Sequence, residues 1–503
     1  MLDASTLRRL TLALGFALVL AAAGLSVGAA QEAAEPLLKL TILHMNDPHG
    51  HYEPYPEEGS AGLVGGFAKA KTIIDQIRRK NEESGRETLV LMAGDLLMGT
   101  VFTETFKGEL GATLLNSMGF TAMTVGNHEF DYGVGNLFKR LKPDLNCPLL
   151  SANIRDESFR PQFDMVKESA IGKTRLVLFG LTTRSSRAEG LFVSDPMCAA
   201  KDVLDRYRES DLIIALTHLG SVQDRNLLKA CPLIDVIVGG HSHEKLTPSF
   251  DTHPRPIVQA GAYARYVGRL DLEVRDGKVE GYKSRLLDLD AEVKDDAEIT
   301  RVVSEYRRRI PECWFASVGS SEVFLNGADH RGWSVYRTAP VAKLVTHVMA
   351  MHAGTQVAIT NAGSIRGSLP KGDVNYADLF RVLPFPNRCV KMDLKGVDLQ
   401  EILRSGVKSS RGYSELLQTF GLTLGKDEPG NLVIEKVRDE EFDPQKTYSV
   451  VTNDFLADRL HRQGLPNKDK TPSAKGTPLI RDLVADFIRR KGPISQRLLD
   501  ELK

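Results

Sequence analysis

The sequence predicts an α/β fold divided into at least two domains. The chain has 503 residues, which is longer than an ordinary single domain. Its composition, 42% hydrophobic and 26% charged, is typical of a globular protein and excludes a largely disordered or membrane-embedded chain. Short apolar, strand-like runs alternate with amphipathic helical segments, and this alternation is typical of α/β domains.

The first 30 residues differ from the rest of the chain. Arg8 and Arg9 precede the apolar run TLALGFALVLAAAGL, and small residues follow, among them Ala29 and Ala30. This order is typical of a secretory signal peptide, so we expect cleavage after Ala29 or Ala30 and a periplasmic or secreted mature protein without a stable membrane span. An uncleaved anchor remains open, although the run is shorter than the roughly 20 residues that span a bilayer. The arginine pair also leaves a twin-arginine route open beside the general one.

Charge and cysteine content exclude several classes of protein. The 65 basic and 65 acidic residues balance, so no global charge draws the chain to nucleic acid or to an anionic membrane. No basic run with interleaved aromatics is present, and we therefore expect no nucleic-acid partner. The five cysteines are widely spaced and form no CxxC pair, so a disulfide framework is not expected, although one or two bridges remain open. They are Cys147, Cys198, Cys231, Cys313 and Cys389.

The first half of the chain reads as alternating strands and helices. The predicted strands span 37–46, 87–95, 120–127, 210–218 and 231–241, and 175–183 and 265–279 continue the same domain. The predicted helices span 64–83, 103–119 and 134–142. Each strand of the first group closes on Asp, Asn or His. Since ligand sites in such sheets gather at the carboxyl ends of strands, these side chains are expected to meet.

The second half reads as a separate α/β domain behind a connector. Residues 296–312 form a charged amphipathic helix, which we interpret as a solvated linker. Beyond about residue 320 a helix is predicted over 341–352, a strand and a Gly-rich loop over 355–374, and a further helix over 398–407. No internal repeat is evident.

The polar residues at the strand ends form a candidate metal centre. They are Asp47 and His49 in DPH, Asp95 in GD, Asn127 in GNHE, His218 in THLG, and His241 and His243 in GHSH. We expect the two side chains of DPH to point to one face, because alternate side chains of an extended strand do. Asp95 stands alone on its turn and is the candidate to bridge two ions. Each motif alone is more often structural, but five in this order after apolar strands predict a site.

The mixed ligand types restrict the metal and its chemistry. A mixture of imidazole, carboxylate and amide ligands is typical of sites for Mn, Fe, Zn or Co. It is not typical of sites that bind metals through thiolates or of calcium sites, whose ligands are all oxygens. Two such ions close together generate a hydroxide nucleophile and clamp the oxygens of an in-line phosphoryl displacement.

GNHEFD contains a second pair of interest. Asp131 follows His128 by three residues, close enough to hydrogen-bond one ring nitrogen and to raise the pKa of the imidazole. A protonated His128 could stabilise charge on a phosphoryl group or donate to the leaving oxygen. An Asp that caps the entry of a helix is the alternative, and the two roles are compatible.

In this order the motifs DPH, GD, GNHEFD, THLG and GHSH resemble the calcineurin-like metallophosphoesterases. Together with the second domain, they resemble the exported bacterial 5′-nucleotidase and UDP-sugar hydrolase family over about 37–495. The resemblance implies a four-layer α/β/β/α metallophosphoesterase domain over 36–290. A helical linker over 291–320 and a smaller α/β substrate-binding domain over 321–500 would follow a signal peptide over 1–30.

The resemblance also implies roles for the motif residues. Two divalent metal ions, drawn from Mn, Zn, Fe, Co or Mg, would be bound. One would be held by Asp47, His49, Asp95 and His243, and the other by Asp95, Asn127, His218 and His241. His128 and Asp131 match the family's catalytic dyad.

In the second domain NAGSIR resembles the family's substrate loop N-x-G-G-x-R. Asn361 and Arg366 would contact the base or phosphate of a nucleotide, and Gly363 would allow close approach of the backbone. Phe385 in LPFPN and Phe455 in TNDFLAD would form an aromatic clamp on the base, with ordinary core packing as the alternative for both rings.

Three departures from the family pattern affect the nucleoside side. Arg337 is followed by TAPVAKL without the usual Glu, Ser364 replaces a Gly of the substrate loop, and ADRLHRQG stands where the family has G-G-D-G before an aromatic. The metal motifs are therefore complete, whereas the motifs that would contact the nucleoside are altered.

The sequence thus predicts an enzyme, a dinuclear-metal phosphomonoesterase that releases phosphate from nucleoside 5′-monophosphates by attack of metal-bound hydroxide. A 2′,3′-cyclic nucleotide phosphodiesterase with 3′-nucleotidase activity and a UDP-sugar hydrolase remain alternatives on the same scaffold. A thiosulfohydrolase-like enzyme and a non-catalytic exported binding protein are less favoured. The predicted partner is a small-molecule nucleotide; the native metals, the base preference and the oligomeric state stay open.

Overall fold

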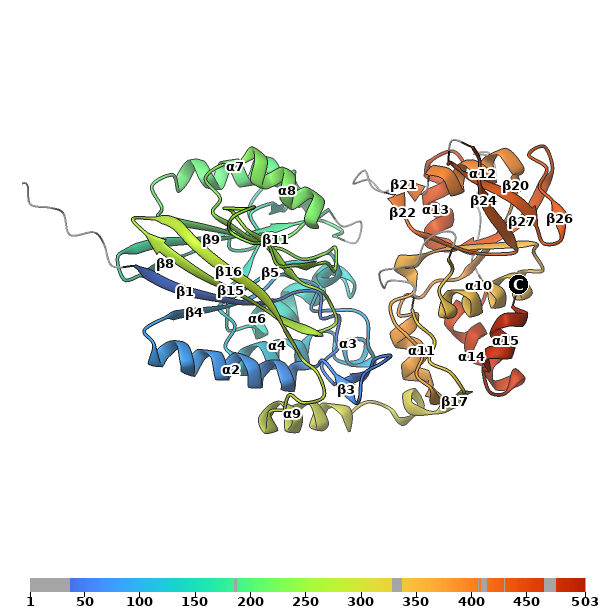
Figure 1. The fold of residues 1–503 in the computed structure, drawn as a ribbon, viewed down its shortest axis with the longest axis horizontal. Coiled ribbons are helices and arrows are strands. Elements are labelled where there is room, and N and C mark those ends of the chain that lie inside the picture. Colours follow the sequence, from blue (N-terminus) through green and yellow to red (C-terminus); the bar gives the residue numbers. More distant parts are fainter. Residues whose placement is uncertain are drawn as a thin grey trace, which may run out of the picture.

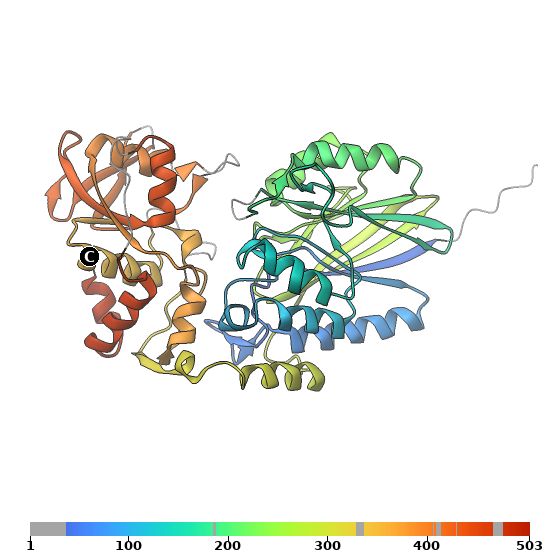
Figure 2. The same cartoon turned by 180° about the vertical axis from the view of Figure 1, so that it is seen from behind.

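The computed structural model places two α/β domains side by side, joined by a helical segment along one edge (Figures 1 and 2). It describes residues 37–184, 188–327, 337–405, 407–408, 414–428, 430–465 and 476–502. The predicted signal peptide, 1–30, lies outside the described residues. Among the helices that the structure describes, none combines the length and the apolar character needed to cross a bilayer.

The first domain is built on two six-stranded sheets. The first sheet has the order β16-β15-β1-β4-β5-β6, in which β1, β4, β5 and β6 are parallel, β15 pairs antiparallel with β1, and β16 pairs antiparallel with β15. Its strands are β1 (Leu38–Met45), β4 (Glu87–Met92), β5 (Ala122–Thr124), β6 (Leu149–Leu150), β15 (Tyr266–Arg275) and β16 (Lys278–Asp288). The second has the order β13-β14-β12-β11-β9-β8. Its strands are β8 (Val166–Ile171), β9 (Thr174–Thr182), β11 (Leu212–His218), β12 (Val236–Val238), β13 (Lys245–Leu246) and β14 (Ile257–Ala260).

These sheets pack face to face and carry helices on their outer faces, as the alternation along β1 shows. Leu40 and Ile42 point into the apolar layer between the sheets, whereas Leu43 and Met45 point into the layer beneath the helices. Helices α2 (Phe67–Glu83), α3 (Val101–Phe106) and α4 (Glu109–Met118) cover the first sheet, and α7 (Pro196–Arg206) and α8 (Ser221–Ala230) cover the second. The expected four-layer α/β/β/α arrangement is confirmed.

Two predicted helices are irregular. The helix expected over 103–119 is interrupted at Lys107 and Gly108, which adopt left-handed φ angles of 51° and 112° and separate α3 from α4. The helix expected over 134–142 is present as one continuous helical run with a π-helical turn in its middle. Its segments are α5 (Val134–Asn136), the π-helical turn η2 (Leu137–Leu141) and α6 (Lys142–Asp144). Minor elements of this domain are β2 (Tyr55–Pro56), β3 (Leu63–Val64), η1 (His128–Phe130), β7 (Ile154–Arg155) and β10 (Phe192–Val193).

The predicted linker contains α9 (Ala297–Arg307) and the 3-10 turn η3 (Glu312–Phe315). The carboxylate of Asp296 caps α9 by accepting the backbone N–H of Ile299 at 3.0 Å. One face of α9 packs into the core of the first domain through Ile299 and Val303. The linker is therefore docked on the first domain along one face instead of being solvated all round.

In the second domain a mixed sheet of order β20-β27-β18-β23 lies between two groups of helices. Its strands are β18 (Val357–Asn361), β20 (Cys389–Lys395), β23 (Leu417–Phe420) and β27 (Thr447–Asn453). One face carries α10 (Pro340–Ala353), α11 (Tyr376–Val382), α14 (Ile480–Lys491) and α15 (Gln496–Glu501), and the other α12 (Gly396–Ser405) and α13 (Asp454–Arg462). Smaller elements are β17 (Ser317–Ser321), η4 (Ala362–Ser364), β19 (Gly372–Asn375), β21 (Val407–Lys408), β22 (Ser414–Glu415), β24 (Leu422–Lys426), β25 (Leu432–Val437) and β26 (Glu440–Glu441).

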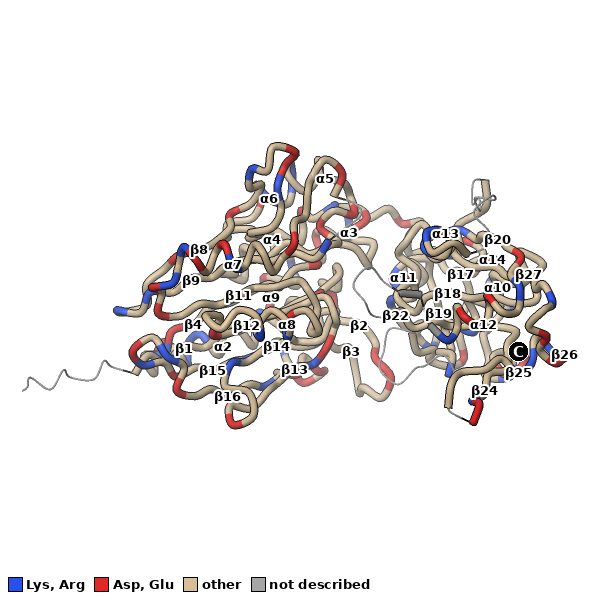
Figure 3. The backbone as a smooth tube through the Cα atoms, turned by 90° about the horizontal axis from the view of Figure 1, so that it is seen from above, with Lys and Arg blue, Asp and Glu red and all other residues tan. Residues whose placement is uncertain are grey.

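Basic and acidic residues are scattered among one another over both domains (Figure 3).

Candidate dinuclear metal centre

Five loops that follow strands of the two sheets bring the predicted metal ligands together. In one group are Asp47, His49 and His243, and in the other Asp95, His218 and His241; within each group the ligand atoms lie within 4.8 Å of one another. Asp47, His49, Asp95 and His218 are buried. The two groups adjoin, because Nε2 of His49 lies 3.9 Å from Oδ2 of Asp95. The structure thus brings six of the seven predicted ligands into two adjacent clusters.

The seventh predicted ligand, Asn127, lies directly before η1, where the following residue is tied to the second cluster. The backbone N–H of His128 donates to Oδ1 of Asp95 at 2.8 Å.

The backbone of these loops differs from the expected extended geometry. Asp47 and His49 have φ angles of 50° and 47°, so the expectation that an extended DPH segment aligns both side chains is wrong. Asp95, His241 and His243 also adopt left-handed φ angles, of 57°, 77° and 54°. Non-glycine residues rarely adopt this region, and such strain concentrates at functional sites where the surrounding structure enforces it. The side chains converge because the chain turns sharply after each strand.

The glycines of the motifs allow these turns to pack closely. A Cβ on Gly126 would lie 2.2 Å from Oδ1 of Asp95 and 2.5 Å from its backbone nitrogen. A Cβ on Gly240 would lie 2.4 Å from the carbonyl oxygen of Ala93. Neither position has room for a side chain, and this accounts for the Gly that precedes the ligands in GNHE and GHSH.

Hydrogen bonds orient two of the imidazoles. Nδ1 of His49 lies 3.3 Å from the carbonyl oxygen of Leu97, and Nδ1 of His218 lies 2.7 Å from that of Ala93. Because a carbonyl only accepts, each Nδ1 carries a proton, and each Nε2 faces the clusters. Burial lowers the pKa of His218, but the carboxylates of Asp95 and Asp47 outweigh burial and raise the pKa to about 10. Burial, reinforced by the Arg366 guanidinium, holds the pKa of His49 well below its usual range, so its ring is neutral.

The donor set fits divalent cations. Oδ1 of Asp47 is buried and forms no hydrogen bond with the residues that the structure describes. Buried polar atoms in this state are rare unless something else satisfies them. Burial alone would raise the pKa of Asp95, but the imidazoles of His218 and His128 lower it well below its usual range, so the carboxylate is ionised. Imidazole nitrogens and carboxylate oxygens together form a mixed N/O ligand set for two cations.

His128 stands beside the clusters without belonging to either. Its Nδ1 lies 2.7 Å from Oδ2 of Asp131, and its Nε2 lies 3.9 Å from Oδ2 of Asp95. Burial lowers the pKa of His128, but the carboxylates of Asp131 and Asp95 outweigh burial and raise the pKa above the ordinary value. A protonated imidazole with its Nε2 directed at the centre can donate a proton there.

Glu129 of GNHE has a structural role that the sequence did not indicate. This fully buried carboxylate accepts four backbone N–H groups. Oε2 accepts from Asp95 at 3.0 Å and from Gly126 at 2.6 Å, and Oε1 accepts from Leu96 at 2.8 Å and Leu97 at 3.3 Å. Glu129 therefore joins the loop of Asp95 to the loop of His128.

Gln259 does the same for the GHSH loop. It is buried at the end of β14, donates to the carbonyl oxygen of Gly240 at 3.0 Å, and accepts from Oγ of Ser242 at 3.1 Å and from the backbone N–H of Glu244 at 3.2 Å. The run PIVQAG could have been found by the same signal as the other motifs, since it too is an apolar strand that closes on a polar residue.

Residues of the second domain reach this centre. Nη2 of Arg366 lies 3.2 Å from Nε2 of His49, and the ring of Phe385 lies 6.1 Å from the ring of His128. Both residues come from motifs that the sequence analysis assigned to substrate binding. Asn361 is buried at the end of β18, and Gly363 lies in η4 directly after it.

Phe455 is placed differently. It is 45% exposed at the start of α13, and the guanidinium of Arg459 lies 5.1 Å from the centre of its ring. The stretch that replaces G-G-D-G is helical, because α13 continues to Arg462.

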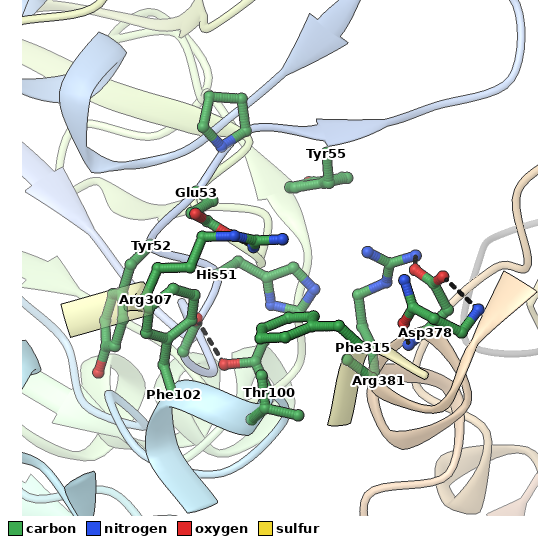
Figure 4. Close-up of a pocket in the computed structure, with 15 residues that line it drawn as sticks. His51, Tyr52, Glu53, Tyr55, Thr100, Phe102, Arg307, Phe315, Asp378 and Arg381 are labelled. Carbon is green, nitrogen blue, oxygen red and sulfur yellow. Dashed lines mark hydrogen bonds and ion pairs between the residues drawn. The ribbon is translucent and has the colours of Figure 1, made fainter. Parts of the chain in front are cut away.

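Two cavities lie along the boundary between the domains. One, of about 120 Å³, lies between the loop of His51 and Tyr55 and helix α11, and it includes Arg307 and Phe315 of the linker region (Figure 4). The other, of about 190 Å³, shares His51 and Tyr55 and extends to Arg366. The domains therefore do not close completely around the centre.

Two family profiles match the chain. Residues 40–245 match the calcineurin-like phosphoesterase family, and residues 317–462 match the 5′-nucleotidase C-terminal domain. Among curated relatives, the protein UshA of Yersinia enterocolitica is 27% identical over 518 aligned residues, which cover 90% of this chain and 92% of that protein. The 5′-nucleotidase of Vibrio cholerae is also 27% identical, and the alignment covers 96% of both chains.

Solved structures show the same architecture. A 5′-nucleotidase precursor from Thermus thermophilus superposes with a TM-score of 0.76 at 26% identity, covering 91% of this chain and 97% of that one. The sulfate thiohydrolase SoxB of Thermus thermophilus superposes with a TM-score of 0.77 at 20% identity, covering 92% of this chain and 95% of that one, a likeness of fold alone. The resemblance drawn from the motifs is confirmed.

Proposed function

This chain belongs to the family that joins a calcineurin-like phosphoesterase domain to a 5′-nucleotidase C-terminal domain, and from this premise we propose that it hydrolyses nucleoside 5′-monophosphates to nucleoside and phosphate. One arrangement carries the proposal. Two adjoining ligand clusters lie beside the His128–Asp131 pair, and Arg366 reaches the same point from the other domain.

The residues that would hold the metals follow from the clusters. We propose Asp47, His49 and His243 for one divalent ion and Asn127, His218 and His241 for the other, with Asp95 bridging. When bound, two such ions supply a nucleophile at neutral pH and stabilise charge on the phosphoryl oxygens.

His128 and Asp131 supply acid catalysis in this proposal. Asp131 fixes the ring by its bond to Nδ1, so that the protonated Nε2 faces the position of the phosphoryl group. From there it stabilises developing negative charge or donates a proton to the leaving ribose oxygen.

The second domain positions the substrate. The guanidinium of Arg366 can pair with two phosphate oxygens, and Asn361 with Gly363 forms the loop that carries it. Phe385 offers its ring beside His128, and Phe455 is the candidate for the opposite side of a base. Binding of this remote part of the substrate orients the phosphorus for attack.

The place of action follows from the N-terminus. We propose that residues 1–30 direct export and that the mature enzyme acts on small nucleotides in the periplasm or outside the cell.

One observation favours a second candidate. Helix α13 occupies the stretch where G-G-D-G stands in the family, so contacts to ribose must differ from the usual ones. A UDP-sugar or a 2′,3′-cyclic nucleotide is therefore the alternative substrate for the same centre.

Turnover by the purified mature protein with Mn²⁺ tests the proposal. The panel is AMP, UMP, 3′-AMP, 2′,3′-cyclic AMP, UDP-glucose and an S-sulfonate ester. We expect 5′-monophosphates to be the best substrates. We also expect His128→Asn to lower kcat by about 10²- to 10⁴-fold at unchanged metal content, because general acid catalysis contributes that much.

The matched control is His253→Asn, which replaces an exposed histidine. It should leave kcat unchanged. A metal-loaded protein that turns over only UDP-glucose or the cyclic nucleotide would replace the first proposal with the second. Turnover of the S-sulfonate ester alone would exclude both.

A further inference from the structure

Asn453 lies where the substrate loop meets the helix of Phe455. It is the last residue of β27 and the N-cap of α13, and it is fully buried. Its Oδ1 accepts the backbone N–H of Leu456 at 2.7 Å. Because this bond requires an acceptor, the amide has one orientation, with its Nδ2 directed at β18.

A closed relay of hydrogen bonds runs from this Nδ2 into the NAGSIR loop. Nδ2 of Asn453 donates to Oδ1 of Asn361 at 3.0 Å and to Oγ1 of Thr360 at 2.9 Å. Oγ of Ser364 donates to the carbonyl oxygen of Asn361 at 2.7 Å and lies 2.9 Å from Oγ1 of Thr360. Since Ser364 uses its proton on that carbonyl, Thr360 must donate to Ser364. The Ser that departs from the family pattern is therefore a member of this relay.

The relay fixes what Asn361 can offer to a ligand. Its Oδ1 faces Asn453, so the other end of the amide is Nδ2 with two N–H donors. Among the residues that the structure describes, none accepts a hydrogen bond from this Nδ2. Gly363 leaves the neighbouring space open, since a Cβ there would lie 3.5 Å from Nδ2 of Asn361.

We propose that Asn453 is a positioning residue that holds Asn361 as a hydrogen-bond donor, so that the substrate atom facing Asn361 is an acceptor. The inference rests on the proposed function, in which Asn361 contacts the nucleotide. Acceptors of this kind are ring nitrogens and carbonyl oxygens of the base or oxygens of the phosphate. An inverted amide would set its oxygen against such an acceptor and leave both unpaired, which is costly in a buried site.

The substitution Asn453→Asp removes the hydrogen-bond donor that faces Asn361 but keeps the acceptor that caps α13. A carboxylate still accepts the N–H of Leu456, and negative charge at the start of a helix is favourable. It cannot donate to Asn361, whose amide then turns its Nδ2 towards Asp and its oxygen towards the ligand. We expect KM for AMP and UMP to rise about tenfold or more, with kcat, the bound Mn²⁺ and the melting temperature close to those of the wild type.

Ribose 5-phosphate, which has a phosphate but no base, distinguishes an acceptor in the base from an acceptor in the phosphate. A KM that rises for AMP but not for ribose 5-phosphate places the acceptor in the base. A KM that rises for both substrates places it in the phosphate.

The matched control is Asn375→Asp, the same change at the N-cap of α11, where Oδ1 of Asn375 accepts the N–H of Asp378 at 2.9 Å. It should leave KM unchanged. If Asn453→Asp does not fold, Asn361→Asp replaces it, since a carboxylate there offers only acceptors and should raise KM equally.

Wild-type turnover of AMP with an unchanged KM in Asn453→Asp would overturn this inference alone. A wild type without turnover of any nucleotide would overturn the proposed function and this inference with it.

Discussion

Five of the proposed ligands occupy a backbone region that their side chains disfavour. Each left-handed non-glycine residue costs on the order of 1 to 3 kcal/mol, so the surrounding structure must enforce the conformation. Glu129 and Gln259 do so by holding the backbone of the ligand loops, and the motif glycines do so by leaving no space between them. The geometry of the centre therefore depends on residues that bind no metal.

The substitution Gly126→Ala tests this dependence. The new Cβ would clash with both the carboxylate and the backbone nitrogen of Asp95, and backbone cannot move aside cheaply. We expect loss of at least one bound metal ion, measured by elemental analysis after dialysis, and a fall in kcat/KM of about 100-fold or more. Gly135→Ala is the control, because a Cβ at Gly135 meets nothing within 4 Å. Full metal content and activity in Gly126→Ala would contradict the argument.

At the scale of the element, five strands of the first domain serve the core along their length and lead to a candidate ligand at their end; they are β1, β4, β5, β11 and β12. Along β1, one side faces the layer between the sheets and the other faces the helices. His44 lies on the inner side, where a Cβ on Gly268 would meet its ring at 2.1 Å. Burial lowers the pKa of His44 to about 3, so the folded protein keeps it neutral.

A pH dependence of stability follows from His44. The unfolded chain takes up a proton on this ring below about pH 6.5, whereas the folded chain does so only near pH 3. The contribution of His44 to stability is therefore constant above pH 6.5 and is lost as pH falls towards 3, by up to about 1.4 kcal/mol per pH unit. We expect the free energy of unfolding of His44→Leu, measured in urea with chelator present, to fall less steeply than that of the wild type between pH 6 and pH 4. His352→Leu, at an exposed site of α10, should run parallel to the wild type. Parallel lines for His44→Leu would refute the prediction.

At the scale of the whole molecule, the centre is completed only where the two domains meet. Arg366 reaches His49 because linker and domain contacts set the second domain against the first. Trp314 of the linker packs on Tyr376 and Phe380 of α11, with ring centres 5.6 Å and 5.1 Å apart. The side chains of Asn326 and Glu58 hydrogen-bond across the boundary.

The substitution Arg366→Lys tests whether this residue of the second domain binds the phosphate at the centre of the first domain. Lysine keeps the charge but loses the planar fork that pairs two phosphate oxygens. We expect KM for AMP to rise about tenfold and the bound Mn²⁺ to stay constant. Arg404→Lys is the control, since Arg404 lies on α12 and donates to the carbonyl oxygen of Leu432. An unchanged KM for Arg366→Lys would place phosphate binding elsewhere.

Much of the fold and of the site could be predicted because parallel strands end at a shared edge. The apolar runs before Asp47, Asp95 and His218 indicated strands, and their polar ends indicated one location. The break at Lys107 and Gly108 could not be predicted, because apolar periodicity continues across both new helices. The left-handed turns at Asp47 and His49 were missed because their φ angles are imposed by neighbouring loops.

The sequence by itself determined the class of fold, the two-domain organisation and the identity of the candidate ligands. These depend on local patterns of hydrophobicity and on motif order, which are written along the chain. Only the tertiary structure decided the left-handed backbone of the ligand loops, the hydrogen bonds by which Glu129 and Gln259 hold these loops, and the hydrogen bond from Asn453 to Asn361. The physical reason is that hydrogen bonds and close approach between distant loops depend on distances in space, and nothing in local spacing encodes them.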